Sequence, residues 1–478
     1  MSARSQLSPP ISYSLNRLFL SAHQNILARV NTAGLIKVNL SMFDEGLSPS
    51  GSERISGPLA ALNFRDFRLF WIGLFISNIG TWMQITASSW LLYQLTNSPF
   101  QLGMNGIFRA VPTLCFGFFG GTLADRYDRK RLLLTTQVVL MFLAFILGLL
   151  DQTGLIRVWH IYLLTLLSAL VGTLDGPARQ AFFPSLIPRS VLPNAIVLNS
   201  LLWKGTVLVG PALAGIAIST VGTDGAFYAN AVSFLAVVVA LLLIRTTAPR
   251  QRKSERFMKD LHEGLSYVYS RKTILGVMVM EATSSVFGLD QAMLTIFARD
   301  ILQVGASGLG FLQSARGLGA VIGSGLLIVM GQPRSQGKIL LCSAVLYGAG
   351  FALFGLSQSF SLSLLLLLVV GTTDTIWGAA RNTILQIDTP DSIRGRVMGV
   401  FNLSNRGLTP LGQAETGFVV PLVGAREATF LGGLFVAVVS LITALRVPSL
   451  PRFIWEEGKT SESASVLDPA AAERTFTP

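Results

Sequence analysis

Charged side chains are scarce in this chain of 478 residues: 13% are Asp, Glu, Lys or Arg, whereas 51% are hydrophobic. A soluble domain carries about a quarter charged residues, so about half of the usual polar coat is missing. The mean hydropathy is +0.57. This composition excludes an ordinary soluble globular protein and predicts that much of the apolar surface faces the lipid bilayer.

Cysteine and histidine are also rare. Cys115 and Cys342 each lie in an apolar run, and we interpret them as small buried apolar side chains. His23, His160 and His262 are too scattered to form a zinc or iron site. The sequence has no G-x-x-x-x-G-K-[ST] loop, so ATP is not expected as the energy source. We therefore expect no cofactor and no metal.

The net charge of +12 would suit a protein that binds nucleic acid. The basic residues, however, form short clusters between long apolar runs and do not follow one face of the chain. Such a distribution is typical of the loops of a membrane protein. Nucleic acid is therefore not an expected partner.

Long apolar segments recur along the chain, and a helix needs about 20 apolar residues to cross a bilayer. These segments are too long and too uniformly apolar for the strands of a membrane barrel. The predicted fold class is an all-α membrane protein with twelve transmembrane helices. The predicted spans lie near residues 67–94, 101–123, 132–151, 158–178, 193–221, 224–244, 273–298, 308–330, 338–357, 361–385, 396–423 and 426–446.

Lys and Arg are divided unequally between the two sets of loops. One set contains 19 of them, including the cluster from Arg126 to Arg131, whereas the opposite set contains 3. Because basic loops remain in the cytoplasm, both termini are predicted to be cytoplasmic, in a multi-pass protein of the plasma (cytoplasmic) membrane.

The longest basic loop lies near the middle of the chain, where Leu261, Leu265, Val268 and Tyr269 recur at helical spacing. This pattern predicts an amphipathic helix along the membrane surface. The predicted segments are a cytoplasmic tail without fixed structure (1–62), a six-helix bundle (63–244), a cytoplasmic linker (245–272), a second six-helix bundle (273–446) and a polar cytoplasmic tail (447–478). The first segment also fits an over-extended reading frame in which translation starts at Met42.

The two halves repeat one another. Gly176–Arg179 aligns with Gly378–Arg381 at an offset of 202 residues, and a looser match at an offset of 207 pairs Arg109 with Arg316. At the first offset, Pro188 meets Pro390 and Lys204 meets Arg406. Parallel repeats of six spans are typical of carriers whose two bundles rock around a central site. Because one chain contains both halves, a monomer is expected.

The loop between the second and third predicted spans reads GGTLADRYDRKR, from Gly120 to Arg131. It resembles the signature loop G-x-L-A-D-R-x-G-R-K/R of the major facilitator superfamily of transporters, and the resemblance covers residues 62–446. It implies two pseudo-symmetric six-helix bundles, a gating loop with Asp125, Arg126 and Arg129, and Asp175 as a partner. Asp128 stands where the superfamily has Gly, a position at which Asp tolerates a left-handed backbone.

Three further stretches, Phe67–Gln84, Gly176–Pro188 and Asp388–Val400, resemble one branch of this superfamily, the enterobactin exporters and macrolide-efflux proteins. This resemblance implies a secondary active transporter, not an enzyme, that works by alternating access. Its partners would be protons and a small amphiphilic substrate such as a drug, a macrolide or a siderophore. A lysolipid or nutrient carrier of the same fold is the alternative, and a membrane enzyme or sensor is a remote one.

A charge at the centre of a span costs about 2.5–3.5 kcal/mol, so it faces a partner or a wet cavity. Asp374 lies near the middle of the tenth predicted span and is the first candidate for proton coupling, with Asp290 and Glu415 as reserves. A static ion pair of Asp374 with Arg406 or Lys204 is the competing interpretation. The candidate cavity and substrate residues are Asn78, Gln84, Arg109, Lys204, Arg316 and Arg406. The sequence leaves the substrate, the coupling ion and the direction of transport open.

Overall fold

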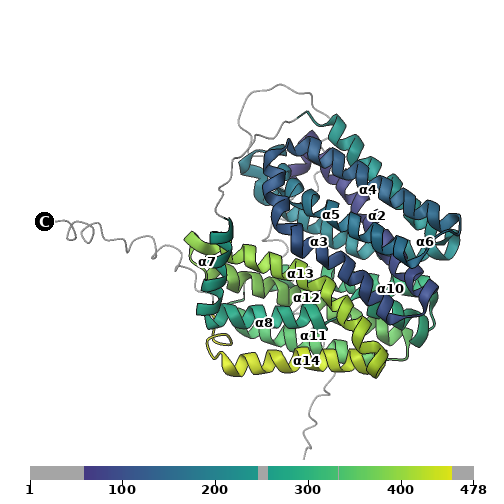
Figure 1. Cartoon of the computed structure of the whole chain (residues 1–478). Helices are drawn as coiled ribbons and strands as arrows, with labels where there is room; N and C mark the ends of the chain where they lie inside the picture. Colours follow the sequence, from purple (N-terminus) through teal and green to yellow (C-terminus); the bar gives the residue numbers. More distant parts are fainter. Residues whose placement is uncertain (1–58, 246–256, 332, 455–478) are drawn as a thin grey trace, which may run out of the picture. The chain divides into compact units, whose positions relative to one another are not determined.

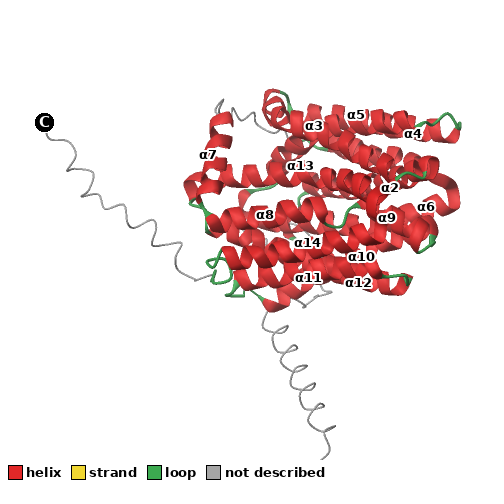
Figure 2. Cartoon of the chain, turned by 60° about the horizontal axis from the view of Figure 1, so that its bottom comes forward, coloured by secondary structure: helices red, strands yellow, loops and turns green. Residues whose placement is uncertain are grey.

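The structure is a computed structural model that describes residues 59–245, 257–331 and 333–454. Every regular element in these residues is helical (Figures 1 and 2), and twelve segments cross the membrane. Judged by length and hydropathy alone, eight helical stretches qualify as spans, one of which holds two. The predicted fold of two six-helix bundles is confirmed.

The first bundle contains five long helices, of which the last holds two spans. They are α2 (Arg65–Thr96), α3 (Pro99–Arg126), α4 (Arg129–Gln152), α5 (Val158–Phe182) and α6 (Leu192–Leu243), with short turns η2 (Ala60–Asn63), η3 (Phe183–Leu186) and η4 (Arg189–Val191). The two spans of α6 are joined at Gly222, whose φ of 88° favours glycine. The predicted boundary between the fifth and sixth spans lies at this position.

The linker helix and the second bundle follow. They comprise α7 (Phe257–Ser270), α8 (Lys272–Phe287), α9 (Gln291–Ile296), η5 (Phe297–Ile301), α10 (Gly305–Met330), α11 (Gln336–Leu356), α12 (Phe360–Ile387), α13 (Asp391–Val423) and α14 (Ala425–Arg446). In Figure 1, the second bundle, in green and yellow, lies beside the first, in purple and blue.

The seventh span is broken, although the sequence predicted one continuous helix. It is built from α8, α9 and the π-helical turn η5, with extended backbone at Gly288 between α8 and α9. The Asp290 carboxylate accepts a hydrogen bond from the Met293 N–H at 3.0 Å and caps α9. The Leu289 N–H donates to the Tyr347 hydroxyl at 3.1 Å. These side chains satisfy backbone groups that the break leaves free, as a membrane interior requires.

The packed chain extends a few residues into both predicted tails. Ala60 and Ala61 are buried, and the Ala61 N–H donates to Asn194 Oδ1 at 2.9 Å. At the other end, Leu450 is buried and the Gly337 N–H donates to the Phe453 carbonyl at 3.3 Å. The remainder of both tails, Met42 included, lies outside the described residues.

The linker helix α7 packs on the second bundle. Val268 is buried, whereas Leu265 and Tyr269 are exposed, so one apolar side of the helix covers protein and another stays open. The Glu263 carboxylate is ion-paired with Arg396 of α13. A Cβ atom on Gly264 would lie 2.9 Å from the Arg396 carbonyl oxygen, so glycine allows α7 to lie against α13.

The interpretation of the two cysteines as buried was wrong. Cys115 of α3 and Cys342 of α11 are both exposed. An apolar run does not reveal which face of a transmembrane helix packs, because its lipid face is as apolar as its packed face.

The two bundles touch closely at one end of the helices. We call the end that carries the α3–α4 and α12–α13 junctions the basic side, and the other end the opposite side. Near the opposite side, a Cβ atom on Gly103 of α3 would lie 2.6 Å from the Cα of Gly417 of α13. A Cβ atom on Gly310 of α10 would lie 3.0 Å from the Cα of Gly215 of α6. Glycines thus let the backbones of the two bundles meet there.

Polar contacts join the bundles at the same end. The Tyr93 hydroxyl of α2 donates to Asp300, and Arg299 Nη1 donates to the Tyr93 carbonyl oxygen at 2.7 Å. The Arg299 guanidinium also lies 5.3 Å from the centre of the Tyr93 ring. We define the opposite-side closure as the Gly103–Gly417 and Gly215–Gly310 contacts together with these bonds.

We expect Gly103→Val to open the opposite-side closure, because the added side chain would collide with the backbone of Gly417. Overpacking of this kind costs about 1–3 kcal/mol, enough to shift a conformational equilibrium about fivefold or more. The measurement is labelling of Thr409→Cys, in a background without native cysteines, by an impermeant thiol reagent added from each side of the membrane. Labelling from the opposite side should be greater in the Gly103→Val variant than in the protein with Gly103. Gly325→Val is the matched control, because a Cβ atom at Gly325 meets no heavy atom within 4 Å; an equal rise there would contradict the assignment.

Candidate functional site

A cavity of about 2800 Å³ lies between the two bundles and is lined by both. Its lining includes Pro184 and Ser185, between α5 and α6, and Ser392 and Gly395 at the start of α13. These residues lie on the basic side, whereas the backbones of α3 and α13 meet near the opposite side. The cavity is therefore open toward the basic side and closed at the other end.

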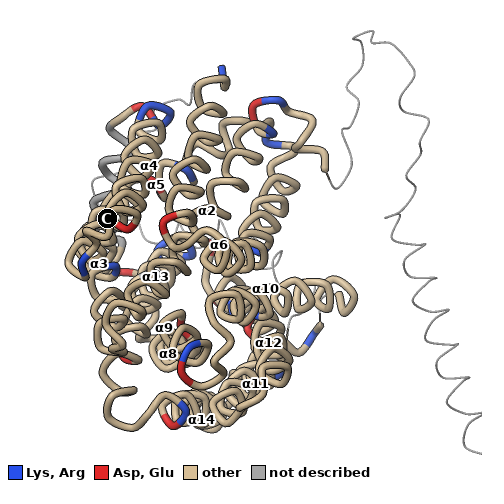
Figure 3. The backbone as a smooth tube through the Cα atoms, turned by 90° about the vertical axis from the view of Figure 1, so that its right-hand side faces the viewer, with Lys and Arg blue, Asp and Glu red and all other residues tan. Residues whose placement is uncertain are grey.

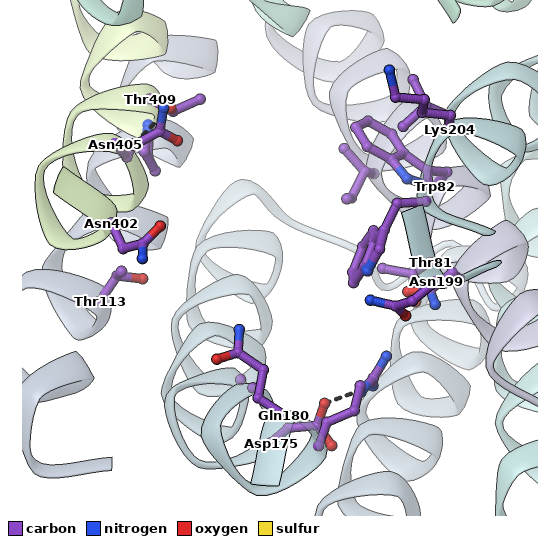
Figure 4. A pocket seen from close by; sticks show the side chains of 18 of the residues that line it. Thr81, Trp82, Thr113, Asp175, Gln180, Asn199, Lys204, Asn402, Asn405 and Thr409 are labelled. Carbon is purple, nitrogen blue, oxygen red and sulfur yellow. Dashed lines mark hydrogen bonds and ion pairs between the residues drawn. The ribbon is translucent and has the colours of Figure 1, made fainter. Parts of the chain in front are cut away.

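The wall from the first bundle is polar and aromatic. In Figure 4, Thr81 and Trp82 of α2 lie beside Asn199 and Lys204 of α6, facing the cavity. The predicted cavity residues Asn78, Gln84, Arg109 and Lys204 all belong to the lining. The Asn230 amide donates to Gln84 Oε1 at 2.6 Å, and Lys204 Nζ donates to Ser324 Oγ of α10 at 2.6 Å. Lys204 thus connects the two bundles.

The second bundle contributes an ion pair that faces the cavity. Arg316 Nη2 lies 3.1 Å from the Asp374 carboxylate, and both side chains are partly exposed, at 34% and 43%. Arg316 Nη1 also donates to the Leu289 carbonyl oxygen at 3.4 Å. The ion-pair partner of Asp374 among the described residues is Arg316, and Lys204 interacts with Asp374 only at longer range. The side chain of Arg406, the other expected partner, lies outside the described residues.

A buried polar cluster that the sequence did not single out as a site lies in the same bundle. Glu281 of α8 accepts hydrogen bonds from Arg381 of α12 and Asn405 of α13. The side chains of Glu281 and Arg381 are only 8% and 15% exposed, and the Arg381 guanidinium lies 4.7 Å from the centre of the Phe401 ring. Glu281 was visible in the sequence as a charge inside a span, but its partner lies 100 residues away.

The two reserve carboxylates differ in position. Asp290 lines the cavity, caps α9 and accepts a hydrogen bond from Thr416 of α13. Glu415 is the neighbour of Thr416, half-buried and outside the cavity lining. A proton entering from the cavity would therefore meet Asp374 or Asp290 and not Glu415.

The predicted gating loop is only partly described. The Asp175 carboxylate accepts from Thr136 at 2.9 Å, Gln137 at 2.7 Å and Arg179 at 2.6 Å, and Arg129 Nη1 donates to the Ala181 carbonyl oxygen at 3.2 Å. These bonds hold α4 and α5 together near the basic side. Asp125 and Arg126 end α3, and their side chains lie outside the described residues, so the latch stays a prediction.

Asp128, the departure from the signature, has a different role from the one expected. Its φ of −61° is not left-handed, and its side chain accepts from the Arg131 N–H at 2.8 Å. The residue is the N-cap of α4, a position that Asp favours and that satisfies a free backbone donor.

The charged lining of the cavity is mainly basic. Among the side chains that the structure describes, eight basic and four acidic ones contribute to it (Figure 3 shows how few charges the helices carry overall). The basic residues are Arg109, Arg129, Arg179, Arg189, Lys204, Arg316, Arg381 and Arg396, and the acidic ones are Asp175, Glu281, Asp290 and Asp374. The cavity therefore carries a positive excess.

Two repeated bundles around a large, one-sided cavity with charged walls define a membrane carrier of the major facilitator superfamily. The chain belongs to the transmembrane secretion effector family, whose sequence model matches residues 56–470. It is therefore a secondary transporter and a multi-pass membrane protein, not an enzyme.

Named relatives and solved structures agree with this family. The enterobactin exporter EntS of Escherichia coli O81 (strain ED1a) is 24% identical over 393 residues, which cover 81% of this chain and 93% of the relative. EntS of Shigella boydii serotype 18 is 25% identical over the same length. The nucleoside transporter NupG, at 14% identity, shares the fold with a TM-score of 0.62, over 80% of this chain and 98% of its own. A bacterial homologue of the lysosomal transporter Spinster, inward-facing and unoccupied, has 12% identity and a TM-score of 0.62, over 85% of this chain and all of its own.

Replacing Arg381 by Gln should destabilise the protein by about 3–5 kcal/mol, because it leaves the buried Glu281 carboxylate without its base. The double variant with Glu281→Gln should recover most of this loss, since no buried charge is left unpaired. Chemical unfolding of the purified protein in detergent measures both. The exposed pair Asp391–Arg394 is the control, and Arg394→Gln should cost no more than about 1 kcal/mol. Equal effects of Arg381→Gln and Arg394→Gln would contradict a structural role for the cluster.

Proposed function

We propose that the protein exports small amphiphilic compounds from the cytoplasm by alternating access, driven by protons that move in the opposite direction. The observation that carries this proposal is the cavity between the bundles, open toward the basic side and lined by the Arg316–Asp374 pair. Since basic loops stay cytoplasmic, the basic side is the cytoplasmic side. The cavity would then be loaded from the cytoplasm, as an exporter requires.

The transport cycle needs the opposite-side closure to open while the basic ends of the bundles approach one another. The glycine contacts suit such a step, because flat backbone surfaces separate without unlocking interdigitated side chains. The bonds of Tyr93 with Asp300 and Arg299 would break on opening. On the cytoplasmic side, Asp125, Arg126 and Arg129 would then latch the bundles, with Asp175 holding α5 in place. The Spinster homologue supports an inward-facing assignment of this state.

Asp374 is the proposed coupling residue. Its carboxylate is partly exposed to the cavity, so a proton can reach it, and its ion pair with Arg316 ties its charge to the packing of α10 and α12. Protonation removes the negative charge, releases Arg316 and alters the cavity wall on which the substrate rests. Asp290 and Glu415 are the reserves. Glu281 is less suited, because two donors and burial hold its carboxylate in a static cluster.

The lining supports an amphiphilic, aromatic-bearing substrate. Trp82 and Trp203 offer apolar faces, and Asn78, Thr81 and Gln84 place polar groups beside them. Apolar walls with a few fixed polar groups are typical of small-molecule sites. The similarity to enterobactin exporters over 81% of the chain supports outward transport of such compounds.

The proposed orientation is tested by fusing green fluorescent protein or alkaline phosphatase after residue 478. The fluorescent fusion should glow and the phosphatase fusion should be inactive, because both reporters would lie in the cytoplasm. A second pair of fusions after Gly154, in the α4–α5 junction on the opposite side, should give the reverse pattern. Full activity of the C-terminal phosphatase fusion would show that the basic side lies outside the cell. The cavity would then be loaded from outside, which contradicts export.

Proton coupling is tested in inverted membrane vesicles that carry a pH gradient. Adding a macrolide, a lipophilic dye or a catecholate siderophore should dissipate the gradient with the wild type and not with Asp374→Asn, whose side chain cannot release a proton. Asp391→Asn, the same change at an exposed residue of α13, is the matched control and should behave as the wild type. If the Asp374→Asn variant dissipates the pH gradient as fully as the wild type, the coupling role moves to Asp290 or Glu415. If the wild type does not dissipate the gradient with any compound, proton-driven export is refuted.

A further inference from the structure

The repeat of the two bundles relates the Arg316–Asp374 pair to a position where one partner is missing. Arg316 of α10 corresponds to Arg109 of α3 at the offset of 207 residues. Asp374 of α12 corresponds, at the offset of 202 that aligns Gly378 with Gly176, to Gly172 of α5. The bases are thus matched in both halves, whereas the acid is present only in the second.

In each half, the two helices that carry these residues are in contact: α3 with α5, and α10 with α12. In the second bundle, a Cβ atom on Gly371 of α12 would touch the Arg316 carbonyl oxygen of α10. In the first bundle, Phe108 of α3 stacks on Tyr162 of α5 with ring centres 4.7 Å apart. The correspondence of Gly172 with Asp374 rests on the alignment of the repeat, and both residues line the same cavity.

The space where an acid would stand is open. A Cβ atom on Gly172 would meet no heavy atom within 4 Å, and Gly172 and Arg109 both line the cavity. Among the described residues, no side chain is hydrogen-bonded or ion-paired to the Arg109 guanidinium. One turn earlier on α3, Asn105 Oδ1 is buried and has no donor. The wall at this point holds polar groups that the protein itself does not satisfy.

The nearest acid on α5 does not fill this role. Asp175 lies one turn beyond Gly172, and its carboxylate is already bound by Thr136, Gln137 and Arg179. Lys204, the other base of the same wall, bonds to the uncharged Ser324 hydroxyl and has Asp374 as an acid at longer range. A half-buried guanidinium without a counter-charge is costly in a membrane protein, so a ligand that supplies the charge is bound strongly there.

We propose that Arg109 binds an acidic group of the transported compound in the space beside Gly172, where the second bundle has its own carboxylate. The substrate class is then an amphiphile that carries a carboxylate or a comparable anion, with its apolar part near Trp82. Lys204 supplies long-range attraction for the same charge. This inference rests on the proposed function insofar as the cavity binds the transported compound, and it narrows the substrates named above to acidic ones.

The test compares two probes that differ in charge, 1-pyrenebutyrate and the neutral 1-pyrenebutanol. Their equilibrium binding to the purified full-length protein in nanodiscs is measured by fluorescence energy transfer from tryptophan, with empty nanodiscs as background. The wild type should bind the acid at least about tenfold more tightly than the alcohol. Arg109→Gln should abolish this preference. Gly172→Asp should abolish it as well, because the new carboxylate pairs with Arg109 as Asp374 does with Arg316.

Two further variants distinguish the effect of a charge at these positions from the effect of side-chain size. Gly172→Asn fills the same space without a charge and should keep a preference for the acid, and Arg109→Lys should keep most of it. Melting temperatures show whether each variant is folded, and Gly172→Asp should be at least as stable as the wild type. Equal affinities for the two probes in the wild type, a preserved preference in Arg109→Gln, or no saturable binding of either probe overturns the inference.

The outcome is independent of proton coupling, because the nanodiscs carry no gradient. If the protein prefers the acid but does not dissipate a pH gradient in vesicles, the anion site is supported and the proposed proton coupling is refuted. A protein that dissipates the gradient with neutral or cationic compounds, and shows no preference for pyrenebutyrate, keeps the coupling and loses the anion site.

Discussion

The structure depends on one constraint: a polar group inside a bilayer needs a partner within the protein or access to water. Continuous helices satisfy the backbone, and the break in the seventh span is tolerated because Asp290 and Tyr347 bind the freed N–H groups. Charged side chains obey the same rule in two ways. Glu281 and Arg381 are largely buried at the edge of the cavity and neutralise one another, and Arg109, Lys204 and Asp374 are placed on the wall of the cavity. The cavity is thus a functional space and also the reason that these charges can exist in the fold.

One part of the contact between the bundles is of the opposite kind, since it uses residues with almost no side chain. Gly103 against Gly417 and Gly215 against Gly310 bring backbones together, and the attraction between them is dispersion over a short, flat surface. Such a surface has little depth, so separating it demands few rotamer changes. Polar bonds within each bundle, as in the Asp175 and Glu281 clusters, hold it together as a body. The polar bonds between the bundles, such as those of Tyr93 with Asp300 and Arg299, would have to break when the bundles separate.

The sequence predicted the features that follow from periodic or cumulative signals. Twelve apolar runs of sufficient length located the spans, the Gly and Pro pattern around Gly176 and Gly378 revealed the repeat, and the spacing from Leu261 to Tyr269 indicated α7. It failed where the outcome depends on tertiary packing. The partner of Asp374, the pairing of Glu281 with Arg381, the exposure of both cysteines and the helix-capping role of Asp128 are set by neighbours distant in the sequence or by local backbone geometry. No pattern along one chain encodes the first three, whereas an Asp directly before an apolar helical run is a known sign of an N-cap.

The short connections on the opposite side have a consequence for what the cell exterior can encounter. The two spans of α6 are joined at Gly222 and α13 is joined to α14 through Gly424, with φ angles of 88° and 94°. Such one-residue hinges leave almost no protein protruding beyond the lipid headgroups at these points. In the proposed orientation, these two connections would offer antibodies and proteases little accessible surface outside the cell. The basic side, in contrast, presents the linker helix α7.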